Sequence, residues 1–276
     1  MALNQCKVTK VKKGDITVHV FTSPEEGEMV NSQIVETPNA VVMIDVPLLK
    51  PYAQEHRQYI EGIGKPIQKI FASHAHPDHW FCLSHFKDHK IFAFKETIDQ
   101  MKMLKDLAIN YHKSLHAELM PDEVILPTDT INEGAIRIDG ITFNLYKLIN
   151  AEDNAMMVID IPSINTLLPQ DLVYNKCYMY VATKTQDGKF TIDTWINYLK
   201  EFKKKGYETI IPGHGRPTDS SIFDENIAYL TFAKKVIESA KDGKEFISRF
   251  KSKYPDYQIE LVLTMSEFMI YQFGKG

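Results

Sequence analysis

One run of six residues, His74-Ala75-His76-Pro77-Asp78-His79, constrains this chain more than any other feature of its sequence. Four of the six side chains are types that bind metal ions, and the run directly follows an apolar segment, residues 67–72, that predicts a strand. A loop at a strand end holds its side chains rigidly and leaves them open to solvent. The pattern therefore favours a fold in which the edge of a sheet carries a metal site.

Apolar runs separated by Pro, Gly and Asn divide the chain into two blocks of strands with helical patterns between them. The first block predicts strands at residues 16–21, 29–35, 41–46 and 67–72, and helices at residues 51–61 and 95–119. The second block predicts strands at residues 136–138, 141–149, 155–161, 164–168 and 209–211, and a helix at residues 193–204. Two blocks of strands with helices outside them predict an α+β fold, a four-layer αββα sandwich of two facing sheets.

The end of the chain has a different character, because apolar residues recur at helical spacing from residue 224 to residue 271. We predict one αββα domain over residues 1–221 and a C-terminal helical extension over residues 222–276 that packs on it.

Composition excludes several classes of function. The chain has 32 basic and 36 acidic residues and a formal charge of −4, so it lacks the basic excess of a nucleic-acid-binding protein. No apolar run approaches the roughly 18 residues of a membrane helix, and the first residues do not follow a secretion-signal pattern. The three cysteines are scattered, which argues against a disulfide framework. We therefore expect a cytoplasmic protein with no nucleic-acid or membrane partner.

The spacing within the histidine-rich run predicts two metal ions. His74 and His76 alternate and can converge on one ion, whereas the bend at Pro77 lets Asp78 and His79 turn toward a second. Imidazole and carboxylate ligands suit zinc, iron or manganese. Two such ions roughly 3.5–4 Å apart lower the pKa of a water between them and polarise the bond under attack, which is hydrolytic chemistry.

The same run resembles the signature of the metallo-β-lactamase superfamily, whose fold is the αββα sandwich predicted above. Asn31 and Asp45 lie in early strands that are similar to the opening of that family. The resemblance extends over roughly residues 15–218, which is most of the chain.

Two later segments continue the resemblance. Residues 168–174, Leu-Pro-Gln-Asp-Leu-Val-Tyr, resemble the family's Gly-Asp motif, which implies that Asp171 bridges the two metals. Residues 211–215, Ile-Pro-Gly-His-Gly, resemble its late Gly-His-Gly motif, which implies that His214 binds the second metal.

The chain departs from the family at one ligand position. Members usually carry a His, often within Thr-x-Gly-His, before the strand that precedes the bridging Asp. Counting back from the strand at residues 155–161 places Glu152 at that position, with Asp153 one step away. A carboxylate makes the first site harder and more anionic, which shifts its preference toward iron, manganese or a more weakly held zinc. Gln170 also replaces the usual Gly before the bridging Asp.

The resemblance implies two sets of ligands. The first metal is expected on His74, His76, Glu152 and Asp171, and the second on Asp78, His79, Asp171 and His214. Asp78 is also the expected catalytic residue, because it can orient the attacking water. The cofactors are therefore two divalent metal ions, with zinc as the first choice and iron or manganese as alternatives.

The leading function is hydrolysis of a small carbonyl substrate, a lactone, thioester or β-lactam, by a hydroxide that bridges the metals. Two alternatives stay open: an iron-dependent redox enzyme similar to the sulfur dioxygenases of the superfamily, and a metal-binding protein without catalysis. One of Tyr174, Tyr178 and Tyr180 is expected to donate to a developing oxyanion. Self-association as a homodimer also stays open.

The remaining histidines and the aromatic pair after the motif have simpler interpretations. His85, His89, His112 and His116 fall on predicted helices or their ends and are interpreted as surface or packing residues. Trp80 and Phe81 are interpreted as core.

Overall fold

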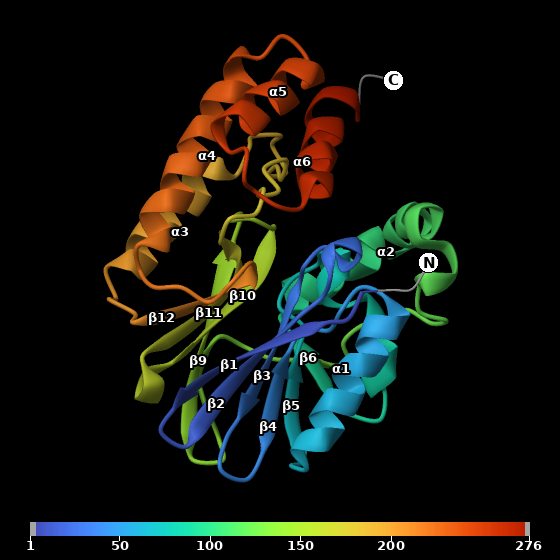
Figure 1. The fold of residues 1–276 in the computed structure, drawn as a ribbon, viewed down its shortest axis with the longest axis vertical. Helices are drawn as coiled ribbons and strands as arrows, with labels where there is room; N and C mark the ends of the chain where they lie inside the picture. Colours follow the sequence, from blue (N-terminus) through green and yellow to red (C-terminus); the bar gives the residue numbers. More distant parts are fainter. Residues whose placement is uncertain (1–3, 274–276) are drawn as a thin grey trace.

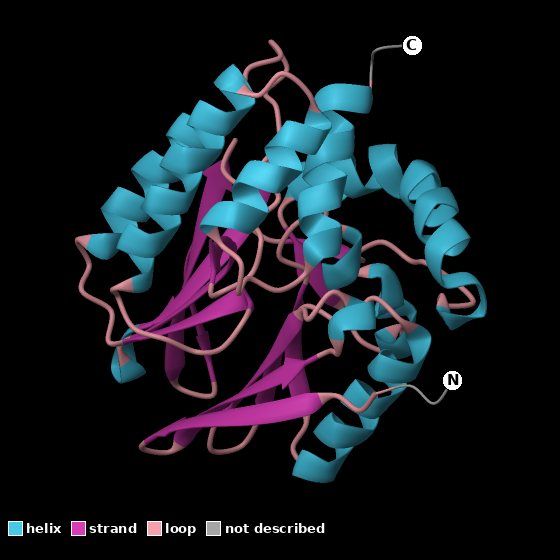
Figure 2. Cartoon of the chain, turned by 45° about the horizontal axis from the view of Figure 1, so that its top comes forward, coloured by secondary structure: helices cyan, strands magenta, loops and turns pink. Residues whose placement is uncertain are grey.

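Two sheets face each other and carry helices on their outer sides (Figures 1 and 2), in a computed structural model that describes residues 4–273. The first sheet follows the order of the sequence: β1 (Lys7–Lys13), β2 (Ile16–Thr22), β3 (Asn31–Glu36), β4 (Val41–Ile44), β5 (Ile67–Phe71), β6 (Ile91–Ala93) and β7 (Asp129–Thr130). The second is ordered β12 (Thr209–His214), β11 (Thr166–Tyr174), β10 (Ala155–Ile161), β9 (Ile141–Ile149) and β8 (Gly134–Ile138). The predicted αββα sandwich is confirmed.

The helices form the two outer layers. The first sheet is covered by α1 (Lys50–Ile63) and α2 (Lys95–His116), and the second by α3 (Ile192–Lys203) and α4 (Ile222–Ser239) (Figure 1). The chain ends in α5 (Gly243–Lys253), α6 (Glu260–Glu267) and a π-helical turn (Phe268–Gln272). No helix of residues 4–273 is long and apolar enough to cross a membrane.

Helix α1 shows how the sequence specifies this packing. Tyr52, His56 and Ile60 follow one another at intervals of four residues, so they share the face that packs on the first sheet, and all three are buried. Pro51 occupies the first turn, where its missing N–H costs no hydrogen bond. Gly64 ends the helix at a φ of 73°, a conformation that glycine adopts without steric strain.

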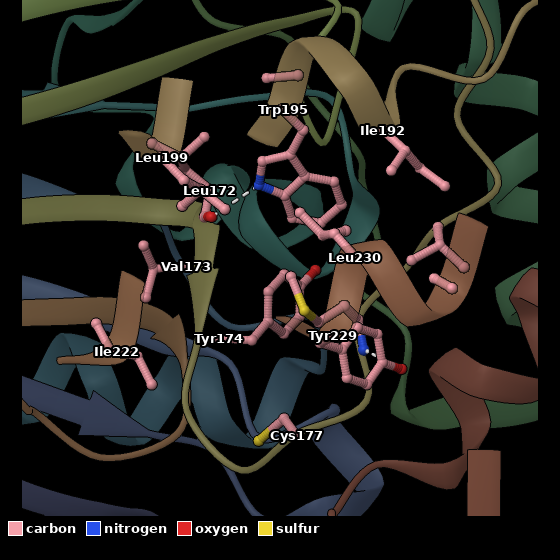
Figure 3. Packing of buried hydrophobic residues seen from close by; sticks show 14 of the residues in the cluster. Leu172, Val173, Tyr174, Cys177, Ile192, Trp195, Leu199, Ile222, Tyr229 and Leu230 are labelled. Carbon is pink, nitrogen blue, oxygen red and sulfur yellow. Dashed lines mark hydrogen bonds between the residues drawn. The ribbon is translucent and has the colours of Figure 1, made fainter. Parts of the chain in front are cut away.

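Apolar side chains fill the space between the sheets and beneath each layer of helices. Val42 and Phe71 of the first sheet belong to one buried cluster with Met157 and Leu168 of the second. Figure 3 shows the cluster between the second sheet and its helices, in which the indole Nε1 of Trp195 donates to the carbonyl of Leu172 at 2.8 Å. Burial on both faces of the central strands β4 and β10 accounts for their almost continuous apolar sequences.

One edge of the sandwich gathers the segments that carry the histidine-rich run. Strands β4 and β5 are parallel and end side by side, and β11 and β12 are parallel in the other sheet. The backbone N–H of Met157 donates to the carbonyl of Ser73 at 2.8 Å, and Val30 forms a bridge with His214. These contacts join the two sheets at this edge, so residues distant in sequence meet there.

The sequence-based strands agree with the structure, with ends within three residues, except at four places. Strand β1 was not predicted, because its sequence Lys-Val-Thr-Lys-Val-Lys-Lys forms an exposed edge strand without an apolar run. The short strands β6 and β7 were also not predicted. The strand predicted at residues 164–168 was wrong at both ends, because residues 162–164 form a 3₁₀ turn and β11 continues to Tyr174.

Candidate metal centre

The histidine-rich run leaves β5 and turns at once. Pro77 begins a 3₁₀ turn over Pro77–His79. His74 and His76, before this turn, join one group of potential ligands, and Asp78 and His79, within it, join another. The Nδ1 of His74 lies 2.8 Å from the hydroxyl of Ser73, which itself donates to Asp45. That hydroxyl therefore accepts from the Nδ1–H of His74, and the Nε2 of His74 is left available to a cation.

The first predicted set of ligands lies together. Each of four residues offers one ligand atom, and these four atoms all lie within 4.8 Å of one another: His74, His76, Glu152 and Asp171. The Nδ1 of His76 is 3.3 Å from Glu152 Oε1, and the Nε2 of His74 is 3.8 Å from Asp171 Oδ2. The four residues come from the loop after β5, the loop before β10 and strand β11, so both sheets contribute.

The second predicted set lies beside the first and shares one residue with it. Asp78, His79 and His214 also bring ligand atoms within 4.8 Å of one another. The two oxygens of Asp171 divide between the imidazoles, with Oδ1 3.2 Å from His79 Nε2 and Oδ2 3.2 Å from His214 Nε2. The same Oδ2 lies 3.8 Å from His74 Nε2, so Asp171 is within reach of both sets, and its role as a bridging carboxylate stays a prediction.

The buried polar atoms at the centre of this cluster fit bound cations. Among residues 4–273, the Nε2 atoms of His74 and His79, Oε2 of Glu152 and Oδ1 of Asp171 are buried and have no hydrogen-bond partner. Burying such groups without partners is costly, and a cation is the partner that satisfies imidazole nitrogen and carboxylate oxygen together. The residues of both sets thus match the chemistry of divalent metal ligands.

Two hydrogen bonds orient the imidazoles of the second set. Asp45 Oδ2 accepts from His79 Nδ1 at 2.7 Å, and the carbonyl oxygen of Glu28 accepts from His214 Nδ1 at 2.9 Å. Both acceptors lack a proton to give, so each fixes the proton on Nδ1 and leaves Nε2 free. Sequence reasoning placed Asp45 in an early strand without assigning this role, and it did not single out Glu28.

The structure distinguishes Glu152 from its neighbour Asp153, both of which are buried. Glu152 points its carboxylate at the imidazoles, as the distance from His76 shows. Asp153 accepts from the backbone N–H groups of Ala75 and Asn154 and from the side chain of Gln100. Asp153 therefore shapes the loops around the centre, and Glu152 occupies the predicted ligand position.

The three tyrosines after Asp171 have different surroundings. The hydroxyl of Tyr174 donates to Asp171 Oδ2 at 2.7 Å and lies 3.2 Å from Glu152 Oε1, while its ring stacks on His214. Tyr178 donates to the carbonyl of Tyr254, away from the centre. Tyr180 is partly exposed, and its ring meets the edge of His76 at a centroid distance of 5.2 Å.

The backbone of β12 packs tightly against the side chain of Asp171. A Cβ added to Gly213 would lie 1.9 Å from Asp171 Oδ1, so only glycine lets β12 approach the carboxylate this closely. Gln170 has a φ of 50°, in the left-handed region that glycine adopts without steric strain. The side chain of Gln170 donates to Gln33 at 2.7 Å, which helps to hold this conformation.

The charges of the cluster shift several pKa values when no cation is bound. Burial disfavours a charged His79, but Asp171 and Asp78 outweigh it and raise the pKa of His79 well above its ordinary value. Against the same burial, Asp171 and Asp78 raise the pKa of His214 to about 10. Burial, reinforced by Asp171, raises the pKa of Glu152 well above its ordinary value. Such perturbed groups in one place are typical of a functional site.

The remaining aromatic and histidine interpretations can be compared with the structure. Trp80 and Phe81 are completely buried, as interpreted. His112, interpreted as a surface or packing residue, is 2% exposed and lies with His116 and Glu28 in a third group of potential ligands.

Comparisons with known proteins support the same fold. In the search of solved structures, the metallo-beta-lactamase IND-7 matches with a TM-score of 0.64 and 22% identity, covering 83% of this chain and all of that chain. VMB-1 matches with a TM-score of 0.62 and 20% identity, covering 84% of this chain and all of that one. A metallo-beta-lactamase from Pontibacter korlensis matches with a TM-score of 0.58 and 17% identity, covering 82% of this chain and 99% of that one. At these identities the likeness shows the fold alone.

The search of curated proteins found no match for this chain. The family model described as the metallo-beta-lactamase superfamily matches residues 26–214, more than half of the chain, and its range includes every predicted ligand. The chain belongs to the metallo-beta-lactamase superfamily.

Proposed function

We propose that this protein is a metal-dependent hydrolase that cleaves a small carbonyl substrate, a lactone, thioester or β-lactam. The observation that carries the proposal is the pair of adjoining ligand sets that share Asp171. Members of the superfamily typically bind divalent metals. Two divalent cations in these sets, zinc in the first instance, would acidify a water between them and polarise the substrate carbonyl.

Asp78 is the proposed catalytic carboxylate. Its Oδ2 lies 3.4 Å from His79 Nε2 and 3.3 Å from His214 Nε2. Burial favours the neutral acid, but His79 and His214 outweigh it and hold the pKa of Asp78 below its ordinary value. Divalent cations in place of the imidazolium charges would likewise favour the ionised carboxylate, which can orient the attacking water and accept its proton.

Two tyrosines are proposed to support the reaction in different ways. The Tyr174 hydroxyl is engaged with Asp171 and Glu152, so it holds the ligands and is not free for substrate. Tyr180 is partly exposed beside His76, and burial together with Glu152 raises its pKa above the ordinary value, so its hydroxyl keeps its proton. We propose that Tyr180 donates to the oxygen of the carbonyl as negative charge develops there.

The carboxylate of Glu152 favours a second candidate, an iron-dependent redox enzyme similar to the sulfur dioxygenases of the superfamily. Glu152 stands where relatives usually carry a His, and a carboxylate is a harder ligand that suits iron or manganese. The two candidates differ in the metal retained and in whether oxygen is consumed. A protein that binds metal without catalysis would show neither activity.

Metal analysis combined with activity assays tests the proposal. The protein is purified without chelators, its metals are quantified, and the sample is assayed against a lactone, a thioester and a β-lactam. His76→Ala removes one ligand of the first set, and His89→Ala is the matched control because His89 pairs with Asp88 outside the centre. We expect at least two equivalents of zinc or manganese, hydrolysis of one substrate class, and loss of hydrolysis in His76→Ala alone. Iron with oxygen uptake and no hydrolysis would refute the hydrolase and favour the redox candidate.

We further propose that the partner is the small-molecule substrate and that neither nucleic acid nor a membrane is involved. The formal charge of −4 supports this, because a polyanion would meet no excess of basic residues. Self-association as a homodimer and residence in the cytoplasm stay predictions that size-exclusion chromatography and cell fractionation can check.

A further inference from the structure

A third group of potential ligands lies next to the proposed centre. Glu28, in the turn between β2 and β3, meets His112 and His116 of α2, and ligand atoms of the three residues all lie within 4.8 Å of one another. His112 and His116 are four residues apart, which places them on one face of the helix, and their rings stack at a centroid distance of 5.9 Å. None of the three residues is a member of the two ligand sets described above.

The polar atoms of this group are buried and lack partners. Glu28 is 4% exposed and His112 is 2% exposed. In the described part of the chain, residues 4–273, no hydrogen bond is made by Glu28 Oε1, His112 Nδ1 or His116 Nε2. A buried carboxylate and two buried imidazole nitrogens without partners are costly to maintain, so something else must satisfy them.

The spacing fits a bound cation better than a direct hydrogen bond. Glu28 Oε1 and His112 Nδ1 are 3.8 Å apart, which exceeds the length of a hydrogen bond. Two ligands of a tetrahedral zinc with bonds of about 2.0–2.1 Å lie about 3.4 Å from each other. The distance of 3.8 Å between Glu28 Oε1 and His112 Nδ1 equals the distance between His74 Nε2 and Asp171 Oδ2 in the first ligand set.

A fourth group of potential ligands, Asp45, His74 and His79, shows the contrast. There, Asp45 already accepts from His79 Nδ1 and from the Ser73 hydroxyl, so its oxygens are occupied. That group is an arrangement of hydrogen bonds that orients the imidazoles. The group of Glu28, His112 and His116 has no comparable internal bonds among the described residues.

We propose that Glu28, His112 and His116 form a third divalent-cation site, which takes zinc or a cation of similar chemistry and joins α2 to the turn between β2 and β3. Two imidazoles and one carboxylate are a frequent zinc ligand set that leaves a fourth position open to water. His116 is only partly buried, so a cation can reach the group from solvent on that side.

The third site is connected to the proposed centre by position and by charge. The carbonyl oxygen of Glu28 orients His214, and its carboxylate lies close enough to Asp78 for that charge to act on it. A cation bound to Glu28 would also fix the backbone that holds His214, so the two sites are expected to influence each other's affinity.

Zinc stoichiometry tests the third site without any activity assay. Metal-stripped protein is titrated with zinc chloride and the number of bound ions is counted by native mass spectrometry. Wild type is compared with His116→Gln and Glu28→Gln, and His89→Gln is the control for loss of a histidine elsewhere. We expect three zinc ions for wild type and His89→Gln, and two for His116→Gln and Glu28→Gln. A third equivalent of zinc should also raise the melting temperature of wild type and not that of His116→Gln.

The experiment separates the third site from the proposed function. If the proposed centre does not bind metal, the zinc count of all four proteins is lower than expected by the same number. Wild type still binds one more zinc ion than His116→Gln in that case. Equal numbers of zinc in wild type and in both variants, bound with equal affinity, overturn the third site. Glu28→Gln keeps the shape of the side chain, so it supplies the comparison if His116→Gln does not fold.

Discussion

Replacing Asp45 by Asn should weaken the second metal directly, through His79, and the first metal less directly, through Ser73 and His74. Asp45 is completely buried and accepts three hydrogen bonds, from the backbone N–H and hydroxyl of Ser73 and from His79 Nδ1. Its φ of 63° is tolerated by Asn as well as by Asp, so the backbone has no reason to change. The substitution therefore tests the hydrogen bonds and the negative charge of Asp45 with the backbone unchanged.

The direction follows from what an amide can offer. If the Asn oxygen stays on the backbone N–H of Ser73, its NH₂ group replaces the oxygen that faces His79 Nδ1. A donor there requires Nδ1 to lose its proton and Nε2 to gain one, and a protonated Nε2 cannot bind a metal. The Nε2 of His79, which is 3.2 Å from Asp171 Oδ1, would then be lost as a ligand of the second set.

Two estimates of the magnitude agree. Loss of a carboxylate that orients a metal-bound His typically costs about 10–100-fold in affinity, or about 1.4–2.7 kcal/mol. A hydrogen bond to a charged group is worth about 1.5–3 kcal/mol. We therefore expect zinc binding at the second ligand set to weaken by about 10–100-fold and zinc binding at the first set to weaken by less.

Isothermal titration of metal-stripped protein with zinc measures the affinity of each binding step. Asp160→Asn is the matched control, because Asp160 is another buried carboxylate that accepts from Asn144, Tyr146 and Tyr207 near the opposite end of β10. It should lower stability without changing zinc affinity. Binding of the second zinc by Asp45→Asn within about threefold of wild type would refute the assignment of Asp45.

Three further predictions follow from the same geometry. Gly213→Ala places a methyl group 1.9 Å from Asp171 Oδ1, so we expect it to destabilise the protein by about 1–3 kcal/mol in thermal melts and to lower its metal content. Gly62→Ala is the control: its methyl group would meet open space, so neither stability nor metal content should fall. Tyr180→Phe should lower kcat by about 100-fold with metal content unchanged, and an unaltered kcat would remove Tyr180 from the reaction. Without metal, folded His79 and His214 keep protons that the unfolded chain, with an ordinary histidine pKa of 6.5, has released above neutrality. The stabilisation from these two protons is complete below pH 6.5 and is lost as pH rises toward 10. The free energy of unfolding of metal-stripped protein should therefore fall by about 1 kcal/mol or more per pH unit between pH 7 and pH 9, and its melting temperature should fall with it. A constant or rising melting temperature over this range would contradict the prediction.

The predictable part of the site is the part that local sequence encodes. His74 to His79 are adjacent in the chain, and Asp171 and His214 follow apolar segments that predict strands, so their meeting at one sheet edge could be expected. Glu152 could be placed by counting back from β10, and its burial beside His76 agrees with that position.

Residues that act across large sequence separations were harder to find. Glu28 lies in a turn with no repeating pattern, and its role depends on β3 meeting β12 at Val30 and His214. His112 and His116 did carry a signal, because their spacing of four residues places them on one helix face. Their partner could not be named until the fold had brought Glu28 beside α2.

The same distinction applies to the fold. Buried strands were predicted because both their faces are apolar, as in β10, whose bounds agree residue for residue. Strand β1 escaped prediction because pairing with β2 defines it, and its side chains stay largely exposed. Edge strands of this kind carry backbone hydrogen bonds without a burial pattern, so a sequence alone gives little sign of them.

The first ligand set spans the interface between the two sheets, and this makes sheet spacing a determinant of coordination. His74 and His76 follow a strand of one sheet, whereas Glu152 and Asp171 belong to the other. The thickness of the apolar layer between the sheets, which includes Val42 and Met157, therefore sets how far the imidazoles stand from the carboxylates. Changes in side-chain volume inside that layer can alter which ionic radius fits, with every ligand left in place. Metal selectivity in this fold is thus open to adjustment by core residues that never touch the ion.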